Sequence, residues 1–477
     1  MKEAVFCLAF DFGASSGRAI LSKFDGNKIE LEEIYRFANE PVKIGGEFCW
    51  DFLRLFHDLK TGLKIAASKG VKISSIGIDT WGVDYGLLDK NGNLLSTPMH
   101  YRDSRTDSIL EDIEQELPYS DIYKSTGIQY MQFNTLYQLC ADLKYRPHIL
   151  KEAKAMLFMP DLFNFFLTGN KFSEYTIAST SQMIDAKSRD WDIPLLESLK
   201  LPVDILQKII MPGSIYGTLT EELQEESGLG AAKVVAVGEH DTASAVAGTP
   251  LEEGNNVFLS SGTWSLLGME LDAPLIDENS LKYNFTNEGG VDETIRFLKN
   301  INGTWIIQQL RHSWSEKIEK VSFPDIIKAV KNVQKKHYAI NPNDKVFMAS
   351  SNMADTIQKY CMDKGQGMPE GLGEIAIAVY NGLTGEYKTV IERLEKITGK
   401  KVEIINMIGG GIQDEFLCQL TADVTGRRVV AGPVEASAFG NIIMQLKAIG
   451  EISGVIEGRL IIKDSISQKQ YFPSKVK

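Results

Sequence analysis

The sequence predicts an α/β protein of two similar lobes with a cleft between them. A chain of 477 residues is too long for one ordinary hydrophobic core and suits two large lobes. Strands, tight hairpins and amphipathic helices recur along it, which indicates mixed sheets with helices on their faces. The second half repeats the strand–turn–strand pattern of the first, so each lobe should present a Ser- and Gly-rich hairpin to the cleft.

The N-terminal segment predicts a β-hairpin. Residues 4–10 and 19–24 are apolar strands, and residues 11–18 form a small polar turn between them. This turn offers a carboxylate, hydroxyls, amides and a guanidinium, which together can hold phosphate oxygens. Asp11 can hold a magnesium ion through water, because magnesium keeps much of its hydration. An ordinary polar hairpin remains the alternative.

The rest of the first half alternates helices and strands. Asp51 should cap a helix that runs to about residue 69 and ends before Gly70. Residues 75–79 and 85–88 are predicted strands on either side of a turn at 80–84, and residues 136–169 are mostly helical. Trp81 in that turn could stack on a sugar or lie in the core.

The strand-to-helix turn at Asp241 is the feature around which the chain is organised. Residues 233–237 form a β-branched, apolar strand, and residues 243–248 are small and helix-tolerant. Open α/β sheets bind their ligands at the carboxyl ends of strands, so Asp241 is a candidate base. Its alternative role is that of a helix N-cap. His240 beside it is more typical of a structural hydrogen-bonding partner than of an acid or base.

The second half supplies the matching turns. Residues 257–268 repeat the strand, Ser/Gly turn and strand of the N-terminus. Residues 402–408 form a strand that runs into Gly409-Gly410-Gly411, and a helix should start near Asp414. Three glycines at a strand end let a ligand approach the backbone closely.

Composition and charge exclude several classes of function. A net charge of -12 argues against nucleic acid as a partner. The five cysteines are scattered and lack a C-x-x-C pair, which predicts a reduced, cytoplasmic protein with no disulfides and no zinc site. We expect no signal peptide and no membrane association, and the sequence contains no Walker A motif and no G-x-G-x-x-G motif after a strand.

Four motifs taken together resemble the FGGY carbohydrate kinases. The likeness covers nearly the whole chain, in order, and is closest to the members that phosphorylate L-rhamnulose at its C1 hydroxyl with ATP. The motifs are residues 11–18, 79–84, 240–244 and 261–265, supported by residues 101–106, 189–192 and 409–411.

The resemblance implies two ribonuclease H-like lobes of the actin-like ATPase superfamily, with a catalytic cleft between them. Residues 1–241 would form the N-terminal lobe for sugar and phosphate, and residues 242–477 the nucleotide lobe. By likeness to the family, Asp241 is the base and Asp11 the magnesium-side carboxylate. The ATP contacts implied are Ala14, Ser15, Ser16, Gly17, Arg18, Thr263, Gln308 and Gly410, and the ketose contacts are Gly82, His240, Asp241, Thr242 and Asn300.

The expected partners are therefore a small-molecule ketose, ATP and Mg²⁺, and the protein is expected to be a monomer or a homodimer. The alternatives are another ketose or polyol kinase, such as one for L-fuculose or xylulose, a sugar-sensing protein without catalysis, and an actin-like ATPase without a sugar acceptor.

Overall fold

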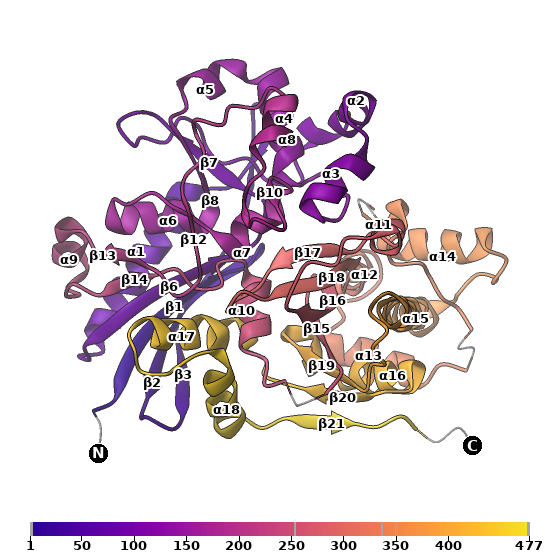
Figure 1. Cartoon of the computed structure of the whole chain (residues 1–477). Coiled ribbons are helices and arrows are strands. Elements are labelled where there is room, and N and C mark those ends of the chain that lie inside the picture. Colours follow the sequence, from indigo (N-terminus) through magenta and orange to yellow (C-terminus); the bar gives the residue numbers. More distant parts are fainter. Residues whose placement is uncertain (1–2, 252–253, 335–336, 349, 351, 475–477) are drawn as a thin grey trace. The chain divides into compact units, whose positions relative to one another are not determined.

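A computed structural model describes residues 3–251, 254–334, 337–348, 350 and 352–474. The chain forms two compact units (Figure 1). The first contains residues 1–250, 270–297 and 436–466, and the second contains residues 251–269, 298–435 and 467–477. The sequence predicts one boundary between the lobes, after residue 241, whereas each compact unit consists of three separate segments of the chain.

The central sheet of the first unit has the strand order β3-β2-β1-β6-β14-β13. β1 is antiparallel to β2 and parallel to β6, which is in turn parallel to β14. The bounds of the strands are β1 (Val5–Phe12), β2 (Ser16–Phe24), β3 (Ile29–Ala38), β6 (Ile73–Thr80), β13 (Ile215–Thr218) and β14 (Lys233–Val235).

Helices cover both faces of this sheet (Figure 1). One face carries α1 (Phe52–Ser68), α6 (Met159–Thr168) and α9 (Glu221–Ser227). The other carries α17 (Ala436–Ala448) and α18 (Val455–Ser465), with α10 (Asp241–Ala247) packed against α17. Short strands β4 (Val42–Ile44) and β5 (Glu47–Cys49) form a separate hairpin.

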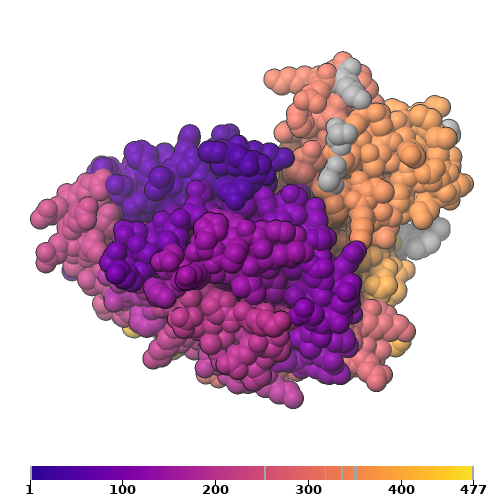
Figure 2. Space-filling model, turned by 90° about the horizontal axis from the view of Figure 1, so that it is seen from above, coloured from indigo at the N-terminus to yellow at the C-terminus, as the bar shows by residue number. Residues whose placement is uncertain are grey.

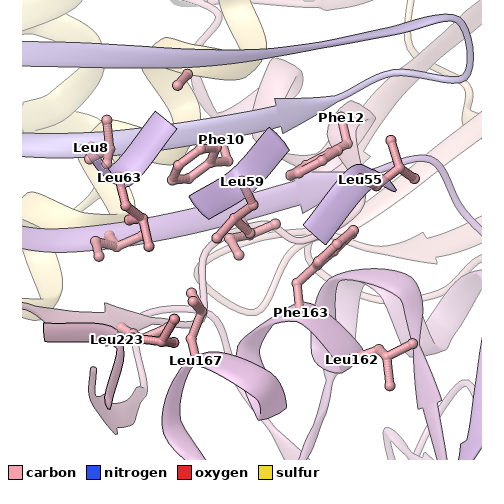
Figure 3. Close-up of a cluster of buried hydrophobic side chains, with 14 of the residues drawn as sticks. Leu8, Phe10, Phe12, Leu55, Leu59, Leu63, Leu162, Phe163, Leu167 and Leu223 are labelled. Carbon is pink, nitrogen blue, oxygen red and sulfur yellow. The ribbon is translucent and has the colours of Figure 1, made fainter. Parts of the chain in front are cut away.

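Period-two alternation along β1 decides which side chains meet which helices. Leu8, Phe10 and Phe12 point toward α1, whose predicted apolar face supplies Leu55, Leu59 and Leu63 (Figure 3). Phe163 of α6 stacks on Phe12 with ring centroids 4.6 Å apart. The intervening residues Cys7, Ala9 and Asp11 therefore face the opposite side, where α17 lies.

An α/β insertion after β6 has its own hydrophobic core and forms a continuous surface of the first unit, purple to magenta in Figure 2. It contains β7 (Tyr85–Leu88), α2 (Ile109–Glu116), α3 (Tyr119–Thr126), α4 (Thr135–Tyr145), α5 (Pro147–Glu152), β8 (Ala155–Phe158), β9 (Ser173–Glu174), α7 (Tyr175–Ala178), β10 (Ile184–Asp185), β11 (Asp190–Trp191), α8 (Ile193–Ser198) and β12 (Ile209–Ile210). Strand β8 interrupts the stretch predicted to be mostly helical. The unit also includes α11 (Glu278–Lys282) and β17 (Thr286–Gly289).

The second sheet repeats the same pattern. Its strands include β18, β16, β15, β19, β20 and β21 in that order, with β15 antiparallel to β16 and parallel to β19. Their bounds are β15 (Asn256–Ser261), β16 (Trp264–Leu271), β18 (Ile295–Asn302), β19 (Ile404–Ile408), β20 (Arg428–Ala431) and β21 (Lys469–Tyr471). The helices are α12 (Trp305–Lys317), α13 (Phe323–Lys331), α14 (Met353–Asp363), α15 (Gly371–Thr398) and α16 (Glu415–Thr425).

This repeated order, with the first strand between an antiparallel and a parallel neighbour, confirms the predicted ribonuclease H-like fold and the internal duplication.

The N-terminal turn is shorter than predicted. Asp11 and Phe12 extend β1 by pairing with Arg18 and Gly17, and the Gly13 amide donates to the Ser16 carbonyl at 2.9 Å. No helix in the described part of the chain is long and apolar enough to cross a membrane.

Candidate active site

Asp241 is the first residue of α10, and the N-cap position belongs to His240. The His240 side chain makes no capping hydrogen bond, and the Asp241 carboxylate accepts from Thr242 Oγ1 at 3.0 Å. Because the proposed capping role is taken by another residue, the carboxylate is available for other contacts. It is 34% exposed, although its surroundings are mostly buried.

A row of polar side chains on α17 runs along the strands that carry Asp11 and Asp79. Residues spaced four apart lie on one face of a helix, so three α17 residues can meet successive strand positions. We name this set the α17 ladder: Ser437 Oγ donates to Asp11 Oδ2 (2.7 Å), Asn441 Nδ2 donates to Asp79 Oδ2 (2.6 Å), and Ser75 Oγ donates to Gln445 Oε1 (2.8 Å). The ladder fixes the two carboxylates, which are paired in the β1–β6 register.

Close packing of α10 on α17 holds Asp241 in the same region of the first unit. A Cβ on Gly440 would lie 1.7 Å from the Ser244 carbonyl oxygen, and one on Gly248 would lie 2.1 Å from the Ala436 oxygen. Only glycine permits this backbone approach. The two helices thus act as one support for the Asp241 and Asp11 carboxylates.

Burial and neighbouring charges raise the pKa of Asp79 and of Asp241. Burial, followed by the negative charge of Asp11, raises the pKa of Asp79 well above its usual value. Loss of hydration likewise raises the pKa of Asp241; the Asp11 charge adds to this effect, and His240 opposes it. A raised pKa makes the ionised Asp241 a better proton acceptor than an ordinary aspartate.

Asp11 has the chemistry for a hydrated cation. Its Oδ2 accepts from both Ser437 and Arg18, the latter at 2.6 Å, and no described residue donates to Oδ1. A free oxygen of an anchored carboxylate suits a magnesium-bound water. Among the described residues, no group of three or more His, Cys, Asp and Glu side chains gathers as a metal site.

The predicted phosphate turn is anchored to β3. The amide and side-chain Nδ2 of Asn39 donate to Ser15 O (3.1 Å) and Gly13 O (2.9 Å). Ser15 is exposed at the tip, Ala14 and Ser16 are half-buried, and Gly17 packs under the Phe37 ring. The turn is therefore rigid at its base and accessible at its tip.

The turn that follows β6 lies against His240. A Cβ on Gly82 would be 3.4 Å from His240 Nε2 and 3.3 Å from Thr180 Oγ1. Val83 has a φ of 69°, which is strained for a β-branched residue and is typical of functional turns. Thr135 Oγ1 donates to the Val83 carbonyl at 2.6 Å and helps to hold this conformation. The structure thus brings Gly82, His240, Asp241 and Thr242 together.

Trp81 belongs to the core. It is 5% exposed, its ring centroid lies 3.9 Å from that of Trp50, and both indole nitrogens donate to Asp84 Oδ2. Of the two interpretations of Trp81 from the sequence, the structure supports core packing.

His240 contacts a buried ion pair that the sequence did not single out. Its Nδ1 lies 3.2 Å from both Nη1 and Nη2 of Arg296, and Arg296 Nη1 lies 3.2 Å from Glu288 Oε2. On the other side of the ring, Nε2 lies 3.5 Å from Asp241 Oδ1. In the sequence, Arg296 could have been recognised as a candidate because it is a charged residue inside an apolar strand.

Three buried carboxyl groups support the turn before Asp241. Glu174 accepts from the Glu239 amide at 3.3 Å, and Glu239 accepts from Asn164 Nδ2 at 2.8 Å and shares a hydrogen bond with Asp161. Burial raises the pKa of Asp161 to about 7 and that of Glu174 to about 8, and it raises the pKa of Glu239 well above its usual value. At least one proton is therefore shared within this cluster at neutral pH.

In the second unit, Thr304 links Gln308 to the β15–β16 turn that contains Thr263. Thr263 lies in the β15–β16 turn, and its carbonyl accepts from the Gly303 amide at 3.1 Å. Thr304 Oγ1 donates to Gly262 O at 2.7 Å and accepts from Gln308 Nε2 at 3.4 Å. The start of α12 is thus tied to the hairpin predicted to contact ATP.

The three glycines after β19 differ from one another. A Cβ on Gly411 would lie 2.1 Å from Ser261 Oγ, and one on Gly409 would lie 3.1 Å from the Ser261 carbonyl oxygen. An added Cβ on Gly410, which is exposed, would meet no atom within 4 Å. Packing therefore explains two of the glycines, and Gly410 is the position open to a ligand. Asn300 is half-buried on β18 in the same unit.

Comparisons with known proteins agree with this architecture. The N-terminal domain model of the FGGY family of carbohydrate kinases matches residues 6–248, and the C-terminal domain model matches residues 257–449. A rhamnulokinase of Bacteroides thetaiotaomicron is 42% identical over 99% of this chain and 96% of its own length. One of Bacillus subtilis is 38% identical, covering 98% of this chain and 95% of its own.

Among solved structures, a gluconate kinase from Lactobacillus acidophilus superposes with a TM-score of 0.83 at 18% identity, covering 99% of this chain and 94% of its own. A xylulose kinase from the same organism gives 0.82 at 18% identity, covering 98% and 94%. At this identity the structures support the fold alone. Both domain models and the full-length relatives establish that this chain belongs to the FGGY family of carbohydrate kinases.

Proposed function

We propose that the protein transfers the terminal phosphoryl group of ATP to the C1 hydroxyl of L-rhamnulose, giving L-rhamnulose 1-phosphate and ADP. The observation that carries this proposal is the full-length likeness to proteins named rhamnulokinase, at 42% identity over 99% of the chain. The kinase class follows from the family, and the choice of ketose follows from these relatives.

Asp241 is the base in this proposal. As the C1 oxygen forms its bond to the γ-phosphorus, the bond from that phosphorus to the β,γ-bridging oxygen breaks and the proton of the C1 hydroxyl passes to Asp241. Phosphoryl transfer has a loose transition state, so alignment of the hydroxyl matters more than strong basicity. The raised pKa of Asp241 suits acceptance of a proton near neutral pH.

The remaining predicted residues have binding roles. We assign Gly82, His240, Thr242 and Asn300 to the ketose. The assignment to ATP comprises Ala14, Ser15, Ser16, Gly17, Arg18, Thr263, Gln308 and Gly410. Asp11 would hold Mg²⁺ through water, and the cation would offset the charge of the phosphates. Because the reaction consumes ATP, we place it in the cytoplasm. We expect the protein to be a monomer or a homodimer.

Coupled measurement of ADP release tests the substrate. The purified protein is assayed with L-rhamnulose, L-fuculose, L-xylulose and glycerol, and the product is identified by ³¹P NMR. We expect the highest kcat/KM with L-rhamnulose and a phosphomonoester at C1. A higher kcat/KM with another acceptor would replace the substrate, and predominant ATP hydrolysis without sugar would replace the kinase assignment.

A further inference from the structure

The imidazole of His240 lies between a cation and a carboxylate, each facing a different ring nitrogen. Arg296 Nη1 and Nη2 each lie 3.2 Å from Nδ1, while Asp241 Oδ1 lies 3.5 Å from Nε2. The guanidinium is held in this orientation because its Nε donates to the Gly289 carbonyl at 2.8 Å. Arg296 is fully buried and His240 is 9% exposed, so solvent competes little for these contacts.

The chemistry of arginine restricts the protonation of the ring. A guanidinium donates hydrogen bonds and cannot accept them, so Nδ1 must present its lone pair to Arg296. A neutral imidazole with an unprotonated Nδ1 carries its proton on Nε2. Glu288 Oε2 lies 3.4 Å from Nδ1, but it also lies 3.2 Å from Arg296 Nη1, whose charge it balances.

We propose that Arg296 is a positioning residue that fixes His240 as the neutral tautomer protonated on Nε2, so that His240 donates a hydrogen bond to an oxygen of the sugar and cannot act as the base. Nε2 lies beside Gly82, where a Cβ would be 3.4 Å from this nitrogen. The absence of a side chain at Gly82 leaves room for a ligand atom at that nitrogen.

This tautomer also determines whether His240 or Asp241 can accept the proton of the sugar hydroxyl. With Nδ1 occupied by a cation and Nε2 already protonated, His240 has no site for the proton of the sugar hydroxyl. The proton acceptor is then Asp241, whose Oδ1 faces the Nε2 proton. The role toward the sugar rests on the proposed function, whereas the tautomer is a property of the protein without substrate.

The tautomer can be read directly by NMR. Protein labelled with ¹⁵N-histidine is recorded without ligands at neutral pH, and the signals of His240 among the six histidines are identified by their loss in His240→Asn. We expect a pyrrole-type shift for Nε2 and a pyridine-type shift for Nδ1. A proton on Nδ1, alone or together with one on Nε2, overturns the proposal.

Two variants test whether Arg296 is the cause. Arg296→Lys keeps a buried cationic donor and should retain the Nε2-protonated tautomer. Arg296→Met combined with Glu288→Leu removes the ion pair as a unit, which avoids an unpaired buried charge. This double variant should show a mixture of tautomers, a KM for the preferred sugar raised about 5- to 10-fold, and an unchanged KM for ATP.

A double variant with the wild-type histidine spectrum and sugar KM would show that Arg296 does not set the tautomer. If the double variant does not fold, the wild-type spectrum and Arg296→Lys still decide the proposal. If another sugar proves to be the substrate, the NMR result stands and the KM is measured with that sugar. Failure of the substrate assignment and failure of the tautomer are therefore distinguishable.

Discussion

The two sheets share a strand order, but the first strands of the two repeats end in different chemistry. In the first, β1 and β6 carry Asp11 and Asp79 on the face held by the α17 ladder. In the second, β15 ends at Ser261 and β19 runs directly into Gly409, with no carboxylate at these positions of the described chain. The same framework thus positions charged groups in one half and exposes backbone in the other.

This difference matches a division of labour in phosphoryl transfer. Groups that accept a proton or hold a hydrated cation need fixed carboxylates, whereas a nucleotide can be bound through amides that no side chain covers. The duplicated fold supplies two equivalent strand ends, and the residues placed there decide the role of each half.

The largest expected effect comes from removing the charge at Asp241. Asp241→Asn should lower kcat by about 100- to 10,000-fold, because general-base help is lost while the side-chain shape remains. Sugar and ATP affinities, measured by calorimetry, should stay close to those of the wild type. Asp25→Asn, at an exposed turn of the same unit, is the matched control and should retain full turnover. Near-normal turnover in Asp241→Asn would remove the base role from this residue.

A matched pair of glycines tests the second half. Gly411→Ala should lower the free energy of unfolding by about 1–3 kcal/mol, because its Cβ would overlap Ser261 Oγ. Gly410→Ala should change stability by less than about 0.5 kcal/mol, since its Cβ meets no protein atom, yet raise the KM for ATP. Urea unfolding and ATP titration separate the two effects. Equal destabilisation by both substitutions would contradict a ligand-facing Gly410.

The sequence predicted those features that depend on local pattern. The continuous apolar run at residues 4–10 predicted β1, and the spacing of Leu55, Leu59 and Leu63 predicted the buried face of α1, because burial of a strand or of a helix face follows from the order of apolar residues. The turns at Gly82 and Asp241 were found for the same reason, since each follows a buried strand. The position of the α10 start was less accurate, because His240, a residue not favoured as a cap, takes the N-cap position.

Long-range features had no local signal. Ser437, Asn441 and Gln445 look like any polar helix residues until α17 packs on β1 and β6, more than 350 residues earlier in the chain. The pairing of Arg296 with His240 and of Glu239 with Asp161 likewise depends on the tertiary fold. The partners in a buried polar network depend on which helices and strands pack together. This packing is not apparent from the local pattern of a single sequence.

The smallest expected effect concerns the buried carboxyls of the first half. Glu239 accepts from Asn164 and, when protonated, can donate a hydrogen bond to Asp161, a pattern that a glutamine amide reproduces with one acceptor and one donor. Because burial raises the pKa of Glu239 well above its usual value, the folded protein keeps this proton after the unfolded chain has released it. The associated stability is complete below the unfolded pKa and is lost as the pH rises toward the folded pKa.

Glu239→Gln does not titrate, so its free energy of unfolding should fall less steeply than that of the wild type between about pH 5 and 8. Some decline should remain, since the pKa of Asp161 is raised to about 7 and that of Glu174 to about 8. Urea midpoints at matched pH values for the two proteins give the comparison. Parallel curves would show that Glu239 is ionised in the folded state, and would place the shared proton elsewhere in the cluster.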